Sequence, residues 1–298
     1  MASQKEIKGR IASVSSTLKI TSAMKMVASA KLRKAQNAIG NMVAYQKGLQ
    51  QILDDLTDGA AVDFGPLLPV PEEDAPARSC VALVCFSSNS SLCGAFNSNV
   101  IREALAAVRE YEAAGTSVTV YSIGRKMAEA MRKSGHESPA DFTQLSARPN
   151  YSEAADLGRE LADGFAKGRF SRVELIYNHF KSTAHQPTVR ETYLPMTDIP
   201  AGTAARERET GTTPEETFII EPDRQTQISL LLPKVLRLKI YTVLLDSAAA
   251  EHAARTVAMQ TATDNGNDLL QQLTLEYNKS RQAKITSEIL DLEGGALE

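Results

Sequence analysis

Apolar side chains recur in alternating steps of three and four residues along the first 56 residues. Starting at Ile7, these steps reach 15 positions, of which 12 are apolar and only Thr21, Lys25 and Gln46 are polar. A seven-residue repeat of this length is typical of a left-handed coiled coil, because 3.5 residues per turn keep one seam facing a partner helix. At about 1.5 Å per residue the helix would be roughly 80 Å long, more than one globular core can cover. It therefore needs a helical partner.

The other end of the chain offers that partner. The same stepping meets a second series of seam positions there: Ile228, Leu231, Val235, Leu238, Leu245, Ala249, His252, Met259, Gly266, Leu270, Leu273 and Tyr277. Pro233 is expected to kink or split this helix near its start. Residues 234–290 would form a helix of roughly 85 Å, which matches the first in length. The two terminal helices can therefore pack antiparallel.

The segment between the helices has a different pattern. Buried strands are predicted at 80–86, 117–123, 172–180 and 188–195, with a short one at 218–220, and helices at 98–114, 125–134 and 151–167. Asn150 is the expected N-cap of the last of these helices. Strands that alternate with helices predict a mostly parallel sheet with crossover helices, and the final two strands predict a hairpin around 185–187.

The predicted fold class is thus α/β: a long antiparallel coiled coil of N- and C-terminal helices with an inserted Rossmann-like α/β domain. We expect an N-terminal coiled-coil helix at 1–58 and a linker rich in Pro and Gly at 59–77. The inserted α/β domain with its loop follows at 78–217, and the C-terminal coiled-coil helix at 218–298.

Charge is divided unevenly along the chain. Residues 1–50 contain nine Lys and Arg and one acid, Glu6, for a net +8, so a total of -3 leaves -11 on the remainder. Such a basic helix could be a solvated face, or could bind nucleic acid, an anionic membrane or an acidic protein partner. Nucleic acid is the weaker of these, because Tyr45 is the only aromatic side chain there that could stack on bases.

Neither a membrane span nor a secretory signal is predicted, because no run of about 18 apolar residues occurs and residues 1–10 contain no apolar signal core. We therefore expect a cytoplasmic chain, or one on a cytoplasmic face. The three cysteines, Cys80, Cys85 and Cys93, match no common zinc spacing and are expected to be buried reduced thiols.

Candidate catalytic chemistry is sparse. The turn after the first strand, residues 87–99, has a single Gly and no Lys, whereas a phosphate-binding loop needs several glycines. Cys93 could be a nucleophile, but no spacing brings a base near it from among His136, His179, His185 and His252. A small apolar residue in a tight turn is the favoured interpretation. The acids Glu72, Glu73 and Asp74 lie in the Pro-rich linker, which offers a metal no fixed geometry. No catalytic, cofactor or metal site is predicted.

Both ends of the chain resemble a known family. Residues 5–36 (KEIKGRIASVSSTLKITSAMKMVASAKLRKAQ) resemble the N-terminal helix of the gamma subunits of F-type ATP synthases. Residues 251–296 resemble the C-terminal helix, and the turn LCGAFN at 92–97 resembles the family's LCGGFN, with Ala95 in place of the second Gly. The signature of the C-terminal helix is matched at Ile285, Thr286, Glu288, Ile289, Asp291, Gly295 and Ala296.

The resemblance implies a central rotor shaft with no catalysis of its own. In this family the antiparallel helices turn inside a hexamer of three alpha and three beta subunits. The α/β domain lies outside the hexamer on the membrane side, against the epsilon subunit and the c ring. Proton flow turns the c ring, and the shaft drives the beta subunits through their catalytic states. The delta, a and b subunits are indirect partners, and neither nucleic acid nor direct membrane insertion is implied.

The site residues that the resemblance implies are all contacts with partner subunits. Those that face the alpha/beta hexamer are Met24, Lys25, Met26, Arg255, Arg281, Gln282, Ile285, Thr286 and Glu288. Those that face the c ring and epsilon are Glu221, Pro222 and Asp223.

The resemblance places the chain as a peripheral protein on the cytoplasmic face of the bacterial inner membrane. The alternative function is an α/β small-molecule-binding module whose coiled-coil arms serve for oligomerisation. A basic coiled coil that tethers nucleic acid is a third possibility.

Overall fold

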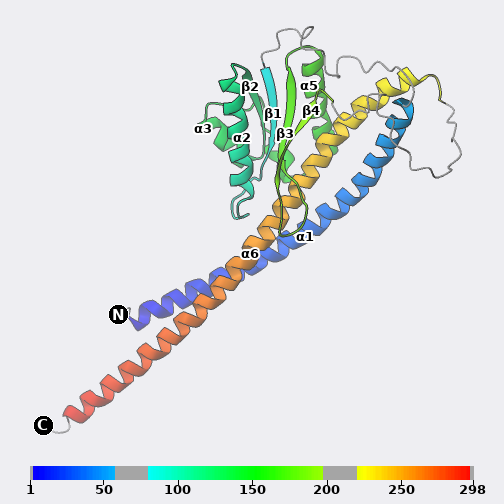
Figure 1. Ribbon diagram of the computed structural model, residues 1–298. Helices are drawn as coiled ribbons and strands as arrows, with labels where there is room; N and C mark the ends of the chain where they lie inside the picture. The colour runs from blue at the N-terminus through cyan, green and yellow to red at the C-terminus, as the bar shows by residue number, and fades with distance from the viewer. Residues whose placement is uncertain (1–2, 58–79, 197–219, 296–298) are drawn as a thin grey trace, which may run out of the picture. The chain divides into compact units, whose positions relative to one another are not determined.

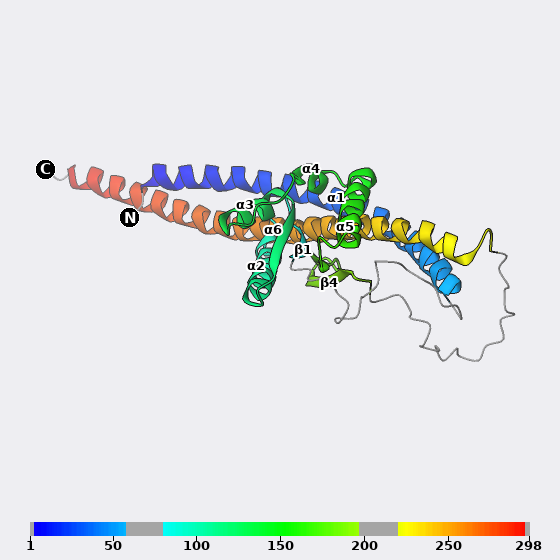
Figure 2. The ribbon, with the colours of Figure 1, turned by 90° about the horizontal axis from the view of Figure 1, so that it is seen from above.

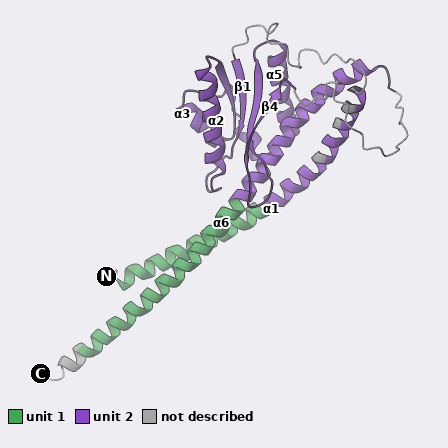
Figure 3. Cartoon of the chain, viewed as in Figure 1, with its two compact units in different colours: residues 1–30, 255–298 green, residues 31–254 purple. Residues whose placement is uncertain are grey.

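The computed structural model describes residues 3–57, 80–196 and 220–295. The chain forms two compact units, residues 1–30 with 255–298 and residues 31–254, which Figure 3 colours separately. We call them the coil unit and the sheet unit. Two long helices, α1 (Gln4–Thr57) and α6 (Arg224–Gly295), each contribute one part to both units.

In the coil unit the first part of α1 and the last part of α6 lie side by side (Figures 1 and 2). Leu18 lies over Gly266, so closely that a Cβ on residue 266 would be 2.6 Å from the Leu18 Cδ2. The Oγ1 atoms of Thr21 and Thr263 are 3.0 Å apart. Because residue numbers rise along α1 as they fall along α6, the pairing is antiparallel, as predicted.

The predicted seam is confirmed on both helices. All 15 seam positions of α1 are buried or half-buried, and so are the 12 that the pattern identified on α6. In the sheet unit Leu32 packs against Ala249 and Ala253, and Leu53 packs against Ile228. The expected split at Pro233 is wrong, because α6 continues unbroken through it. Pro233 is exposed, so the carbonyl oxygen that loses its helical donor can be hydrated.

The sheet has four strands: β1 (Cys80–Phe86), β2 (Ser117–Ile123), β3 (Arg172–Asn178) and β4 (Thr188–Leu194). Their order is β2-β1-β3-β4. The central strand β1 is parallel to both neighbours, with Val81 opposite Val118 on β2 and Arg172 on β3. The pair of β3 and β4 is antiparallel. The predicted mostly parallel sheet with a terminal hairpin is confirmed.

Two layers of helices cover the sheet (Figure 1). The helices α2 (Phe96–Ala113) and α3 (Arg125–Lys133) pack on the face that carries Val81, Leu83 and Cys85. The other face, which carries Ala82, Val84 and Phe86, packs against α5 (Tyr151–Ala166) and α6. Because β1 is buried on both faces, its sequence is a continuous apolar run rather than an alternating one.

Several boundaries differ slightly from the prediction. The helix α2 begins at Phe96 instead of 98, and β3 ends at Asn178 instead of 180. The short helix α4 (Thr143–Ala147) was not predicted, since five residues are too few for a helical period. The N-cap at Asn150 is confirmed, because its side chain accepts a hydrogen bond from the backbone N–H of Ser152.

Some predicted segments lie outside the described residues. These are the whole of the linker at 59–77, the loop at 197–217, and two of the three residues of the short strand at 218–220; Ile220 itself is in no strand. None of the described helices combines the length and the hydropathy that a membrane span requires.

Candidate functional site

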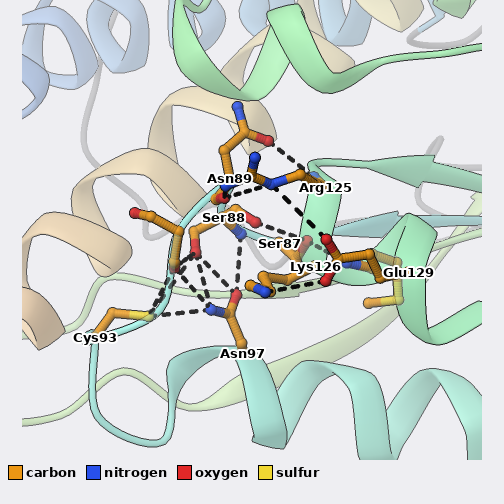
Figure 4. Close-up of polar contacts among 10 residues, drawn as sticks. Ser87, Ser88, Asn89, Cys93, Asn97, Arg125, Lys126 and Glu129 are labelled. Carbon is orange, nitrogen blue, oxygen red and sulfur yellow. Dashed lines mark hydrogen bonds and ion pairs between the residues drawn. The ribbon is translucent and has the colours of Figure 1, made fainter.

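The carboxyl end of the sheet is where an α/β fold of this kind would hold a phosphate group. Here the turn after β1 lies directly against the start of α3 (Figure 4). Gly124, which joins β2 to α3, has φ +97, and a Cβ there would be only 2.2 Å from the carbonyl oxygen of Ser87. This close approach brings together the segments that follow β1 and β2.

The first backbone N–H groups of α3 are already used within the chain. Those of Arg125, Lys126 and Met127 donate to the Asn89 Oδ1 (2.8 Å), the Ser88 carbonyl oxygen (3.1 Å) and the Ser87 Oγ (2.8 Å). Free N–H groups at a helix start are what bind a phosphate group. The turn after β1 therefore occupies the position that an anion would take.

The side chain of Asn97 stabilises the same turn by hydrogen bonds. Its Oδ1 accepts from the backbone N–H of Ser88 (3.0 Å), and its Nδ2 donates to the Ser90 carbonyl oxygen (3.2 Å) and to the Cys93 Sγ (3.2 Å). Leu92, with φ 67, is 60% exposed at the tip of the turn. The polar groups of the turn after β1 and of Asn97 thus hydrogen-bond to one another, which gives this polar cluster a structural role.

Cys93 lies in this turn, where its hydrogen-bond partners include Ser88, Ser90 and Asn97. It is buried against Phe96 and Ala250, and its thiol donates to the carbonyl oxygen of Ser90. Of the candidate bases, His136 pairs with Glu112 at 2.9 Å and His179 with Asp246 at 2.6 Å. This environment agrees with the small buried residue that the sequence favoured.

The other two cysteines differ in burial. Cys85 is fully buried, and burial, together with the nearby Glu174 carboxylate, raises the pKa of its thiol far above the ordinary value. Cys80 is only half-buried, beside the hydroxyl of Thr119 (3.4 Å), so the expectation of a buried thiol is wrong at this position. All three are free thiols, and among the described residues no cluster of His, Cys, Asp and Glu could hold a metal.

The predicted contacts on α1 do not all point the same way. Met26 is 65% exposed, whereas Met24 is half-buried. Lys25 is half-buried on the seam, and its Nζ donates to the Oε1 of Gln260 on α6. Arg255, on α6, is buried. Sequence reasoning missed Gln260, although its place beside the seam residue Met259 was a signal.

The predicted contacts near the end of α6 are all exposed. Within the described part of the coil unit, every side chain from 281 to 290 is exposed, including those of Arg281, Gln282, Ile285, Thr286 and Glu288. Glu288 pairs with Lys284 at 3.5 Å, and the Thr286 hydroxyl donates to the Gln282 carbonyl oxygen at 2.9 Å. These bonds stay on one helix and leave the surface open to a partner.

The third predicted group, Glu221, Pro222 and Asp223, lies just before α6 and is exposed. Asp223 caps the helix, because its carboxylate accepts from the backbone N–H of Thr226 (2.8 Å) and from the Thr226 hydroxyl (2.7 Å). These two bonds hold the pKa of Asp223 below its ordinary value. The resemblance implies only a partner contact for Asp223, and the sequence does not predict its capping role.

Known proteins resemble this chain over its whole length. The ATP synthase family model matches residues 3–297. The "ATP synthase gamma chain" of Phocaeicola vulgatus is 50% identical over 298 residues, which is 100% of both chains. That of Flavobacterium johnsoniae is 40% identical over 296 residues, covering 99% of this chain and 98% of the relative.

Solved structures share the fold at lower identity. A chain of the Euglena gracilis mitochondrial ATP synthase matches with a TM-score of 0.64 at 20% identity, covering 99% of this chain and 93% of that one. A chain from the central stalk and c ring of the Tetrahymena thermophila mitochondrial enzyme matches with a TM-score of 0.53 at 20% identity. It covers 82% of this chain and 99% of that one. At this identity the likeness shows the fold alone.

Proposed function

The chain belongs to the ATP synthase gamma-chain family, and from that membership we propose that it is the central rotor shaft of a proton-translocating F-type ATP synthase. It transmits the rotation of the c ring to a hexamer of three alpha and three beta subunits. The observation that carries the proposal is 50% identity over the entire chain to a relative named as a gamma chain. The antiparallel coil is the element that such a shaft requires.

The α/β domain is proposed to meet the epsilon subunit and the c ring, with delta, a and b as indirect partners. Support comes from the Tetrahymena match, whose chain belongs to a structure described as central stalk and c ring. Glu221, Pro222 and Asp223 are proposed as part of this contact. The protein is then peripheral, on the cytoplasmic face of a bacterial inner membrane. Bacterial relatives support this placement, and no membrane-crossing helix occurs in the described part of the chain.

The coil residues are proposed to contact the hexamer in different ways. Met26 and the exposed residues of α6, Arg281, Gln282, Ile285, Thr286 and Glu288, offer open surface. Met24 and Arg255 are less exposed, so they contribute at the edge of the contact. Lys25 already has Gln260 as a partner, so its charge attracts an acidic surface from the seam without a fixed bond to it.

We further infer that the chain does no chemistry itself. The support comes from the carboxyl end of the sheet. The first backbone N–H groups of α3 there all have acceptors within the chain. The alternative function, a small-molecule-binding module with coiled-coil arms, would need free donors at this edge. No feature of the described residues favours that alternative over the shaft.

The stoichiometry of the purified complex tests the proposal. A tagged chain should carry with it alpha and beta subunits in threefold molar excess, since one shaft serves a hexamer, and ATPase activity should travel with them. Quantitative mass spectrometry of the complex measures the ratio. An equimolar ratio to either subunit would contradict a central shaft.

A further inference from the structure

Asp246 of α6 is bonded to two consecutive residues that follow β3. One carboxylate oxygen accepts from the backbone N–H of Phe180 at 2.9 Å, and the other lies 2.6 Å from the Nδ1 of His179. The Asp246 side chain is only 13% exposed. Charge-assisted hydrogen bonds are among the strongest in proteins, and this carboxylate uses both of its oxygens. Asp246 thus fixes the end of β3 to one point on α6.

Phe180 strengthens the same point by packing. Phe180 is half-buried and packs against two apolar clusters, one that includes Leu32 of α1 and Ala249 of α6, and one that includes Cys93 in the turn after β1. Two long helices and the sheet therefore meet at one aromatic side chain within the sheet unit. We call Asp246, His179 and Phe180 the clasp.

Other links between the sheet and the helices are less specific. The chain connects them through residues 58–79 and 197–219, and about 20 residues can reach roughly 70 Å when extended, so connectivity alone does not fix the sheet on α6. The apolar contact of α6 with the sheet is non-directional. A second link, between Lys239 of α6 and Glu191 of β4 at 3.1 Å, joins two side chains that are 35% and 28% exposed. The His179 side chain is itself 49% exposed, but Asp246 is less exposed than either Lys239 or Glu191 and also accepts from a backbone N–H.

We propose that Asp246 is a positioning residue for torque transfer. The clasp fixes the α/β domain in position on α6. A force applied to the domain therefore turns the helix instead of shifting the domain along it. This inference rests on the proposed function, in which the c ring drives the α/β domain and the coil delivers the torque. The clasp matters only under load, because hydrolysis by a hexamer and shaft without a c ring places no force on the domain.

The experiment compares two carboxylates that each pair with a histidine. Asp246→Ala removes the clasp, whereas Glu112→Ala removes the pair with His136 (2.9 Å), both members of which lie within the α/β domain. In complete synthase in vesicles we measure protons pumped per ATP hydrolysed, and in detached hexamer with shaft the ATPase rate. Asp246→Ala should lower the pumping ratio about threefold or more. Loss of a charge-assisted bond shifts the equilibrium away from the state in which the α/β domain is fixed on α6. The detached ATPase of Asp246→Ala should equal that of the wild type, and Glu112→Ala should change neither.

Two further variants keep the test decisive. Asp246→Asn retains an acceptor for the Phe180 N–H and should restore part of the ratio, and Phe180→Leu should lower it in complexes that assemble. An unchanged ratio in Asp246→Ala, or an equal fall in Glu112→Ala, overturns the clasp. If Asp246→Ala does not assemble, an unchanged pumping ratio in both Asp246→Asn and Phe180→Leu overturns the clasp.

The proposed function fails in a different way. In that case the wild-type chain would not restore pumping to a synthase that lacks its gamma subunit. If the wild type restores it and Asp246→Ala restores it equally, the inference about the clasp alone is wrong.

Discussion

At the scale of single residues, Gly124 makes the strictest demand on the sequence. Its φ of +97 suits glycine, and an added Cβ would be 2.2 Å from the backbone oxygen of Ser87, which cannot move without displacing β1. We expect Gly124→Ala to lower the free energy of unfolding by about 2–4 kcal/mol, from strain and steric conflict together. Urea unfolding of the purified chain, followed by circular dichroism, measures this change.

The matched control is another glycine with positive φ. At Gly115 φ is +75, and a Cβ would meet nothing within 4 Å. Gly115→Ala should therefore cost only the conformational strain, about 1–2 kcal/mol. Equal losses at both positions would mean that the contact with Ser87 adds nothing.

At the scale of elements, each strand of the sheet carries one buried group that resists ionisation. Burial raises the pKa of Cys85 on β1 and of one tyrosine on each other strand: Tyr121, Tyr177 and Tyr193. The unfolded chain loses these protons from about pH 8.5 for the thiol and about pH 10 for the phenols, while the folded chain keeps them. The free energy of unfolding should therefore fall as the pH rises, by up to about 1.4 kcal/mol per pH unit for each group.

Tyr193 provides a clean test of this slope. It is only 4% exposed, and its hydroxyl has no hydrogen-bond partner among the described residues, so Tyr193→Phe loses no bond there. We expect the variant to differ little from the wild type near neutral pH and to be the more stable of the two above about pH 10.5, where one ionising group has been removed. Urea midpoints at the two pH values decide this. Tyr151→Phe, at a position 45% exposed, should show no such difference.

The elements also show what the sequence could predict and what it could not. The run from Cys80 to Phe86 identified β1 because both faces of that strand are buried, and the seam identified both long helices because their pairing is periodic. The clasp could not be predicted, since Asp246 and His179 are 67 positions apart and meet only through the way β3 ends against α6. A charged residue on a long helix carries no local signal of such a partner.

The same limit applies to the site residues. The seam pattern placed Lys25 on the inner face, yet the resemblance assigned it to a partner contact, and only the structure reveals that its ammonium group is bonded to Gln260. Asp223 was assigned in the same way and also caps α6. Roles that depend on side-chain direction need coordinates, whereas periodic burial does not.

At the scale of the whole molecule, the exposed end of α6 separates the free chain from the assembled one. Every side chain from 281 to 290 is exposed, and Ile285, Ile289 and Leu290 are 48%, 51% and 61% exposed. A helical end without a packing partner is marginal in water, so its amide hydrogens should exchange rapidly in the purified chain. If the hexamer encloses this end, exchange should slow by about tenfold or more in the complex, which corresponds to roughly 1.4 kcal/mol of added local stability.

Hydrogen exchange followed by mass spectrometry measures this protection, with residues 100–108 of α2 as the internal control. Val100 and Ala104 there are fully buried in the chain alone, so assembly should leave their exchange unchanged. Protection of α2 as well would indicate a general stabilisation of the chain instead of a contact at the end of α6. Equal exchange of 281–290 in the free and assembled states would place this end outside the hexamer, and the proposed contacts at Ile285, Thr286 and Glu288 would then have to be abandoned.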